Sequence, residues 1–176
     1  MRNDNSLVGA AGVHYAAYHL ARNGLLALPT VRNTQGIDLI VARPDGRKHA
    51  NIQVKTSHLS RTRYWPVCSA EKFGKLSFGK DDYYLLLRWH RDDLPSLARA
   101  EADVSEVEGF LLTAEEAKKE LEASLKSRAR KGKRWKYPLI IAVDKDRGME
   151  QSPEYKHRDW QEDGERWRKR WCEFRL

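Results

Sequence analysis

Residues 37 to 57, IDLIVARPDGRKHANIQVKTS, have the pattern of a β-hairpin and decide the fold. The first half, Ile37 to Ala42, is apolar and rich in β-branched residues, and the second half, Ala50 to Thr56, alternates. Between them, Pro44-Asp45-Gly46 combines a proline that presets φ with a glycine that can take positive φ. We therefore predict two antiparallel strands joined by a tight turn.

Polar side chains on this hairpin suggest a functional site. Alternation assigns Gln53 and Lys55 to one face of the second strand, opposite Ile52 and Val54, and Asp38 interrupts the apolar first strand. Pairing of the strands would bring together a carboxylate, an amide oxygen and an ammonium group. That set is typical of a site that handles phosphate with a divalent cation. The alternative is that these side chains are simply solvated on a half-exposed strand.

Length and composition predict one globular domain spanning residues 1–176. The chain is 40% hydrophobic and has no apolar run as long as the roughly 20 residues of a membrane span, so we expect no membrane association. The start of the sequence lacks the pattern of a signal peptide. Because Cys68 and Cys172 form no metal or redox motif, we expect a cytoplasmic location.

The charge balance favours a polyanionic partner such as DNA. Lys and Arg total 33 against 25 Asp and Glu, which gives a formal net charge of +8. Residues 57–65 set cations beside Tyr64 and Trp65, as in a loop that follows a phosphate backbone and stacks on bases, and residues 126–136 concentrate further cations. An exposed hairpin and a solvated helix end are the alternatives. The candidate nucleic-acid contacts are Arg61, Arg63, Lys131, Lys133 and Arg134.

The remaining patterns predict an α/β fold. A helix should begin at Asn5 or Ser6 and end near Arg22, with Gly9 and Gly12 allowing close approach to the sheet. The further strands that we predict cover residues 25–29, 83–89, 109–112 and 137–143.

Two helices complete the prediction. Thr113 and Glu116 form a capping box for one, and Asp159 caps a closing helix. Trp160, Trp167 and Trp171 would line one face of that closing helix, as expected for core or homodimer packing.

The order of these elements resembles the PD-(D/E)XK nuclease superfamily. The likeness is strongest to small bacterial members of unknown function that are related to Holliday-junction resolvases. The matching segments are GAAGVHYAAYHLARNG (9–24), GIDLIV (36–41) and IQVKTS (52–57), followed by YYLLLRW and GFLLTAEEAK. The resemblance covers a core of about residues 7–120, and residues 121–176 add the basic segment, the last strand and the tryptophan-striped helix. It implies a restriction-endonuclease-like mixed sheet of about four or five strands flanked by helices.

The resemblance also implies roles for individual residues. Asp38 would be the metal-binding carboxylate, Gln53 occupies the usual Asp or Glu position, and Lys55 is the family's lysine. The carbonyl oxygen of Val54 would be a further ligand of Mg²⁺ or Mn²⁺. The sequence has Val13 where the family carries a glutamate on its first helix.

Two classes of function follow from these residues. In the first, the protein is a Mg²⁺-dependent endonuclease in which Asp38, Gln53 and Lys55 catalyse hydrolysis of DNA phosphodiester bonds. In the second, the fold is kept as a nucleic-acid-binding or protein-interaction module that does not cut, because the acids at positions 13 and 53 have been replaced.

Overall fold

The computed structural model of the chain describes most, but not all, of the sequence. The segments described are residues 5–30, 36–57, 63–76, 78–89, 107–130, 139–143, 153–155 and 158–176. The elements in these segments are α1 (Asn5–Arg22), β1 (Leu26–Pro29), β2 (Leu39–Ala42), β3 (His49–Ser57), β4 (Tyr64–Cys68), the 3-10 helix η1 (Ala70–Lys75), β5 (Asp82–Trp89), β6 (Val107–Thr113), α2 (Ala114–Arg130), β7 (Leu139–Ala142) and α4 (Trp160–Cys172). None of these helices is long and apolar enough to cross a membrane.

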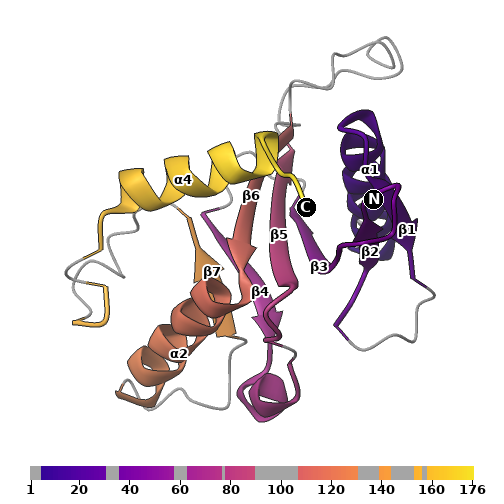
Figure 1. Cartoon of the computed structure of the whole chain (residues 1–176). Helices are drawn as coiled ribbons and strands as arrows, with labels where there is room; N and C mark the ends of the chain where they lie inside the picture. The colour runs from indigo at the N-terminus through magenta and orange to yellow at the C-terminus, as the bar shows by residue number, and fades with distance from the viewer. Residues whose placement is uncertain are drawn as a thin grey trace, which may run out of the picture.

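The main sheet has five strands in the order β1-β2-β3-β5-β6 (Figure 1). β3 and β5 are parallel, and the other neighbouring strands are antiparallel. This confirms the predicted α/β fold with a mixed sheet. β7, which we predicted as the last strand, does not join that sheet but pairs with β4 in a separate two-stranded sheet.

The predicted hairpin is confirmed as β2 and β3. Leu39 pairs with Ile52 in antiparallel register, and the turn closes with a hydrogen bond from the Arg43 N–H to the Lys48 carbonyl oxygen. Gly46 has φ of 69°, the left-handed conformation that its position in the turn requires. β3 alternates between buried and partly exposed side chains, as expected for a strand that buries one face.

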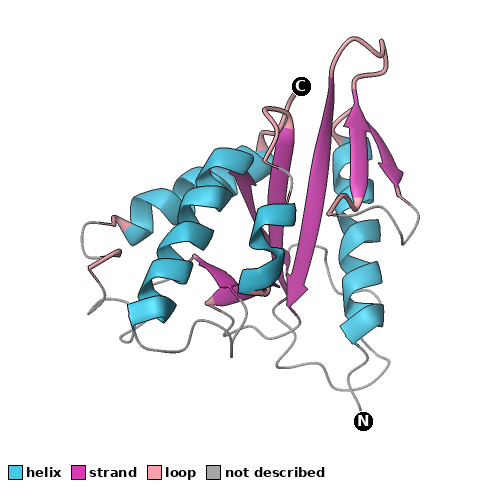
Figure 2. Cartoon of the chain, turned by 90° about the horizontal axis from the view of Figure 1, so that it is seen from below, coloured by secondary structure: helices cyan, strands magenta, loops and turns pink. Residues whose placement is uncertain are grey.

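Helix α1 covers the face of the sheet to which Ile52 and Val54 point. Figure 2 shows strands lying between α1 and the other helices. At Gly12 the helix backbone meets β3, because a Cβ there would lie 1.8 Å from Thr56 Oγ1. The prediction of close approach is therefore confirmed for Gly12, but it is wrong for Gly9, where a Cβ would meet no described atom within 4 Å.

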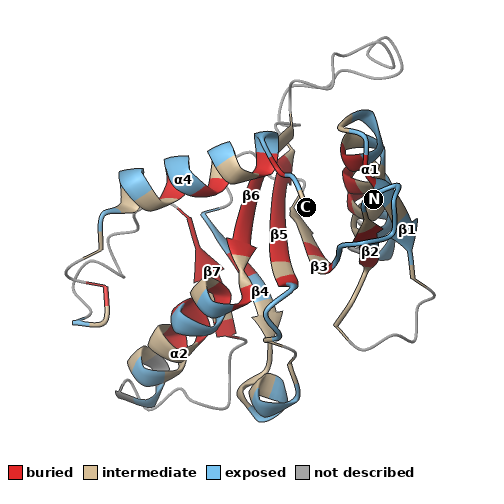
Figure 3. Cartoon of the chain, viewed as in Figure 1, coloured by how far each residue is buried: buried red, intermediate tan, exposed pale blue. Residues whose placement is uncertain are grey.

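The core has two clusters, one on each face of β5, and Figure 3 shows β5 and β6 as the most continuously buried strands. Leu85 and Leu87 belong to the cluster under α1, whereas Leu86 belongs to the cluster under α2, β4 and β7. Trp65 is 1% exposed in the second cluster and donates its indole N–H to the Leu87 carbonyl oxygen, 3.2 Å away. The hypothesis that Trp65 stacks on bases is therefore wrong, although Tyr64 beside it is 48% exposed.

The C-terminal helix α4 packs against β6 and contributes to both clusters. Trp167 joins one cluster and Trp171 the other, so these two residues of the predicted tryptophan stripe serve the core, whereas Trp160 is partly exposed and belongs to neither cluster. Asp159 caps the helix as predicted, accepting a hydrogen bond of 2.9 Å from the Glu162 N–H. The closing helix is therefore part of the core.

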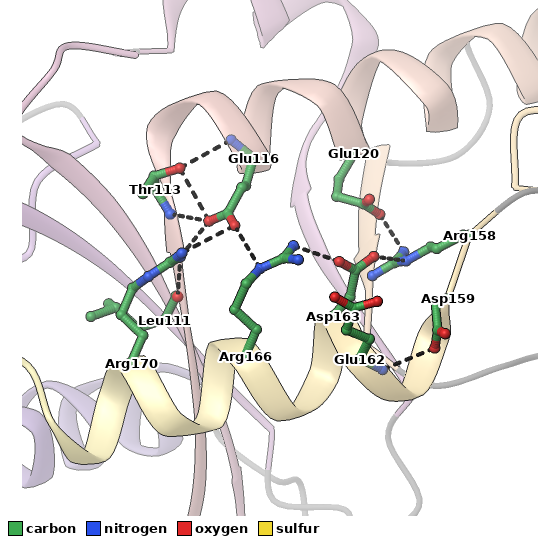
Figure 4. A network of polar contacts seen from close by, with 10 residues as sticks. All are labelled: Leu111, Thr113, Glu116, Glu120, Arg158, Asp159, Glu162, Asp163, Arg166 and Arg170. Atoms are coloured by element: carbon green, nitrogen blue, oxygen red, sulfur yellow. Dashed lines mark hydrogen bonds and ion pairs between the residues drawn. The ribbon is translucent and has the colours of Figure 1, made fainter.

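Charged side chains also hold α4 to α2 (Figure 4). Glu116 forms the predicted capping box with Thr113 and also accepts hydrogen bonds from Arg170. Arg158 lies 2.6 Å from a Glu120 carboxylate oxygen and 3.2 Å from one of Asp163. These pairs tie the end of the chain to the helix that follows β6.

Candidate functional site

The candidate site lies where β3 extends beyond its pairing with β2. That pairing ends at Leu39 and Ile52, but β3 continues to Ser57. Asp38 occupies the adjacent position. Its N–H donates to the Ile52 carbonyl oxygen at 3.0 Å, and its Oδ2 accepts a hydrogen bond of 2.8 Å from the Val54 N–H. The Asp38 carboxylate thus accepts the hydrogen bond that a neighbouring strand would otherwise accept from the β3 backbone.

The Val54 carbonyl lies on the same edge of β3 as this carboxylate. In a strand, the N–H and C=O of one residue point toward the same neighbour. Because the Val54 N–H points to Asp38, its carbonyl oxygen points to that edge as well. Oδ1 of Asp38 accepts no hydrogen bond from a described residue. Two kinds of oxygen donor therefore share one edge, at the point where the sheet stops pairing.

Gln53 contributes an amide to this region. Its Oε1 is buried and has no hydrogen-bond partner among the described residues. Gly36, with φ of 74°, passes close by, because a Cβ there would lie 3.9 Å from Gln53 Nε2. The segment that leads into Asp38 thus runs beside the amide. A buried acceptor without a donor is unfavourable, and a bound cation or water would relieve it.

Lys55 is half-buried on the same face of β3 as Gln53. Its ammonium group forms no ion pair with a described carboxylate, Asp38 included. It does act on Cys68 at the end of β4. Burial raises the pKa of the Cys68 thiol, and the positive charges of Lys55 and Lys72 partly offset that rise. The strand that carries Gln53 and Val54 therefore also carries a positive charge that no described carboxylate pairs with.

The ligand atoms that these residues offer are of the type that Mg²⁺ or Mn²⁺ binds, since these ions prefer oxygen ligands. Asp38 Oδ1, Gln53 Oε1 and the Val54 carbonyl oxygen would supply three, of which one carries charge. No group of three or more His, Cys, Asp or Glu residues occurs at a possible metal site in the described segments. The sequence of α1 contains no acid, and Val13 packs against the core cluster on the far face.

The predicted nucleic-acid contacts are only partly described. Arg63 is exposed at the start of β4, where its carbonyl oxygen accepts a hydrogen bond of 3.0 Å from the Val143 N–H. Arg61, Lys131, Lys133 and Arg134 lie outside the described residues.

The sequence analysis assigned neither Cys68 nor Lys72 to this region. Their position depends on β4 crossing the sheet face, which no local pattern indicates. A scan against protein-family models and a search of curated proteins both find no match to this chain.

Proposed function

We propose that this chain is a nuclease-like DNA-binding protein of the PD-(D/E)XK type, whose site hydrolyses DNA phosphodiester bonds with Mg²⁺ or Mn²⁺. The observation that supports it is the arrangement around Val54. The Asp38 carboxylate binds its N–H at 2.8 Å, and the neighbouring Gln53 carries a buried oxygen with no described hydrogen-bond partner. These oxygen atoms, which could bind a metal, lie on and beside β3 at the point where its pairing with β2 ends.

Each residue of the site has a role in this proposal. Asp38, Gln53 and the Val54 carbonyl would hold the metal, which supplies an activated water and polarises the phosphate when it is bound. The hydrogen bond from the Val54 N–H holds Oδ2 of Asp38, which leaves Oδ1 as the oxygen that would bind the metal. Lys55 stabilises the negative charge that develops on the phosphate in the transition state.

A second candidate function is a DNA-binding module that does not cut. The observation that favours it is the single carboxylate of the site, together with the absence of any acid from α1. Metal affinity depends strongly on carboxylate charge, and here an amide and a valine replace two acids. Such a module would keep its positive charge and hence its affinity for DNA.

The test combines DNA cleavage with metal-dependent stability. Asp38→Asn keeps an oxygen for the Val54 N–H but removes the charge, and Lys55→Ala removes the ammonium group. Asp45→Asn is the matched control, because Asp45 lies in the exposed turn of the same hairpin. We expect cleavage of plasmid DNA by wild type and Asp45→Asn with Mg²⁺ or Mn²⁺, and none by the two site variants.

Metal binding should also be visible without DNA. A metal concentration tenfold above its dissociation constant stabilises the folded state by about 1.4 kcal/mol, and Asp38→Asn should abolish that gain. If wild type binds DNA but neither cuts it nor gains stability from metal, the catalytic proposal is wrong and the binding module is supported. Cutting that persists in Asp38→Asn would assign the activity to other residues.

A further inference from the structure

β4 crosses the sheet face that carries Gln53 and Lys55. Near its start, the Trp65 indole donates to the Leu87 carbonyl oxygen. At its end, the Cys68 thiol lies within electrostatic range of both Lys55 and Tyr84. The strand therefore ends beside the candidate site, and the 3-10 helix η1 begins two residues later.

An aromatic stack fixes η1 beside the same site. Phe73 of η1 lies 5.7 Å from Phe78, ring centre to ring centre, and Phe78 stacks on Tyr84 at 5.9 Å. Tyr84 is the register partner of Gln53 across the parallel pair β3–β5. η1 is therefore anchored through three rings to the strand position next to Gln53.

The outer surface of η1 is basic. Lys72 and Lys75 are exposed, as is Lys80 in the turn that follows. None of these three forms an ion pair with a described carboxylate, and Lys72 approaches the same thiol, Cys68, as does Lys55. Glu71 is the one acid in the sequence of η1. Ammonium groups from two separate elements, Lys55 of β3 and Lys72 of η1, thus both lie near the thiol at the end of β4.

We propose that η1 is a DNA-backbone clamp, in which Lys72 and Lys75 bind phosphates that flank the phosphate at Lys55. The proposal rests on the function proposed above, and it adds the surface that positions the substrate. Lysine acts on phosphate as a point charge and reads no sequence, so the clamp would set the register of the DNA without selecting bases. The Phe73 anchor would keep the clamp at a fixed distance from the site.

The first test measures how DNA affinity depends on salt, in EDTA, so that metal and cleavage play no part. The double variant Lys72→Gln/Lys75→Gln removes two phosphate contacts and should lower the slope of log K against log salt by about 1.8. From 50 to 200 mM salt, wild type should then lose about 12-fold more affinity than the variant. The matched control is Arg47→Gln/Lys48→Gln, which makes the same charge change about 23 Å from Lys55 along β3.

The second test locates the DNA by alkylation of cysteines. Both cysteines are free; Cys68 is partly buried within electrostatic range of Lys55 and Lys72, and Cys172 is exposed on α4. We expect double-stranded DNA to slow the reaction of Cys68 with iodoacetamide, measured by mass spectrometry, while Cys172 reacts at an unchanged rate. In Lys72→Gln/Lys75→Gln the protection should be lost at the same DNA concentration.

The outcomes separate the clamp from the catalytic proposal. Equal salt slopes for the two double variants, or DNA binding that leaves Cys68 unprotected, would overturn the clamp even if the wild type cuts DNA. A lower slope and lost protection in Lys72→Gln/Lys75→Gln, together with a wild type that never cuts, would support the clamp and overturn only the catalysis.

Discussion

Replacing Gly12 by alanine tests how closely α1 packs on the strand that carries the site. A Cβ at Gly12 would lie 1.8 Å from Thr56 Oγ1 and 2.9 Å from Thr56 Cβ. Rotation of the Thr56 side chain can move Oγ1 but cannot move Cβ. The helix therefore has to shift away from β3, next to Lys55.

The size of the effect follows from two opposing terms. Forcing extra atoms into a packed core costs about 1–3 kcal/mol, and the contact at Gly12 is severe enough for the upper end of that range. Alanine in place of glycine within a helix returns about 1 kcal/mol. We expect Gly12→Ala to destabilise the fold by about 2 kcal/mol and, at this chain length, to lower Tm by about 4–8 °C.

Gly9→Ala is the control on the same helix. A Cβ at Gly9 meets no described atom within 4 Å, so this variant should show the helix-propensity gain alone and raise Tm by about 2–4 °C. Thermal unfolding followed by circular dichroism measures both. Thr56→Ala in the Gly12→Ala background should recover part of the loss, because it removes Oγ1 but leaves Cβ. Equal shifts in the two glycine variants would refute close packing at Gly12.

Two further predictions concern the core and its ion pairs. Burial acts to raise the pKa of Glu116, but hydrogen bonds from Arg170 and Thr113 and the charge of Arg170 outweigh it, so this pKa lies below its ordinary value of 4.5. The carboxylate therefore stabilises the fold above pH 4.5 and loses that effect as the pH falls through the folded-state pKa. In urea unfolding at neutral pH, the free energy of unfolding of wild type should exceed that of Glu116→Gln by about 1–3 kcal/mol. A difference between the two proteins that stays constant as the pH is lowered below 4.5 would contradict this. Trp65→Phe removes the indole donor to Leu87 and part of a buried ring, and should cost about 1–3 kcal/mol by the same assay, whereas an exposed base-stacking tryptophan would cost almost nothing.

The sequence predicted those parts of the fold that depend on neighbouring residues. The turn at Gly46 and the cap at Asp159 are set by side chains within a few positions, so their patterns were sufficient. The separate sheet was missed because Tyr64 pairs with Ala142, far along the chain. Trp65 was misinterpreted for a related reason. Arginines precede it in the sequence, but its burial depends on β5.

The features of the candidate site likewise fall into those that the sequence predicted and those that depend on tertiary structure. The residue types and the alternation of Gln53 and Lys55 were evident from the sequence, and the burial pattern of β3 confirms that alternation. The bond from the Val54 N–H to Asp38 depends on where β2 ends, and the burial of Gln53 Oε1 depends on its tertiary surroundings. Neither the end of β2 nor the burial of Gln53 Oε1 has a local signature in the sequence. Lys72 was missed because a short 3-10 helix carries no periodic pattern.

The charge of the site bears on how a metal could act here with so few acids. Asp38 and Lys55 carry opposite charges, so the protein alone offers a cation an almost neutral set of ligands. A DNA phosphate held between Lys55 and η1 would add the negative oxygen that Gln53 and Val13 fail to supply. Mg²⁺ commonly binds through one carboxylate together with substrate phosphate, so bound DNA would add a ligand and strengthen metal binding at the proposed site. Metal and DNA would then each raise the affinity for the other by the same factor, because coupling between binding sites is reciprocal.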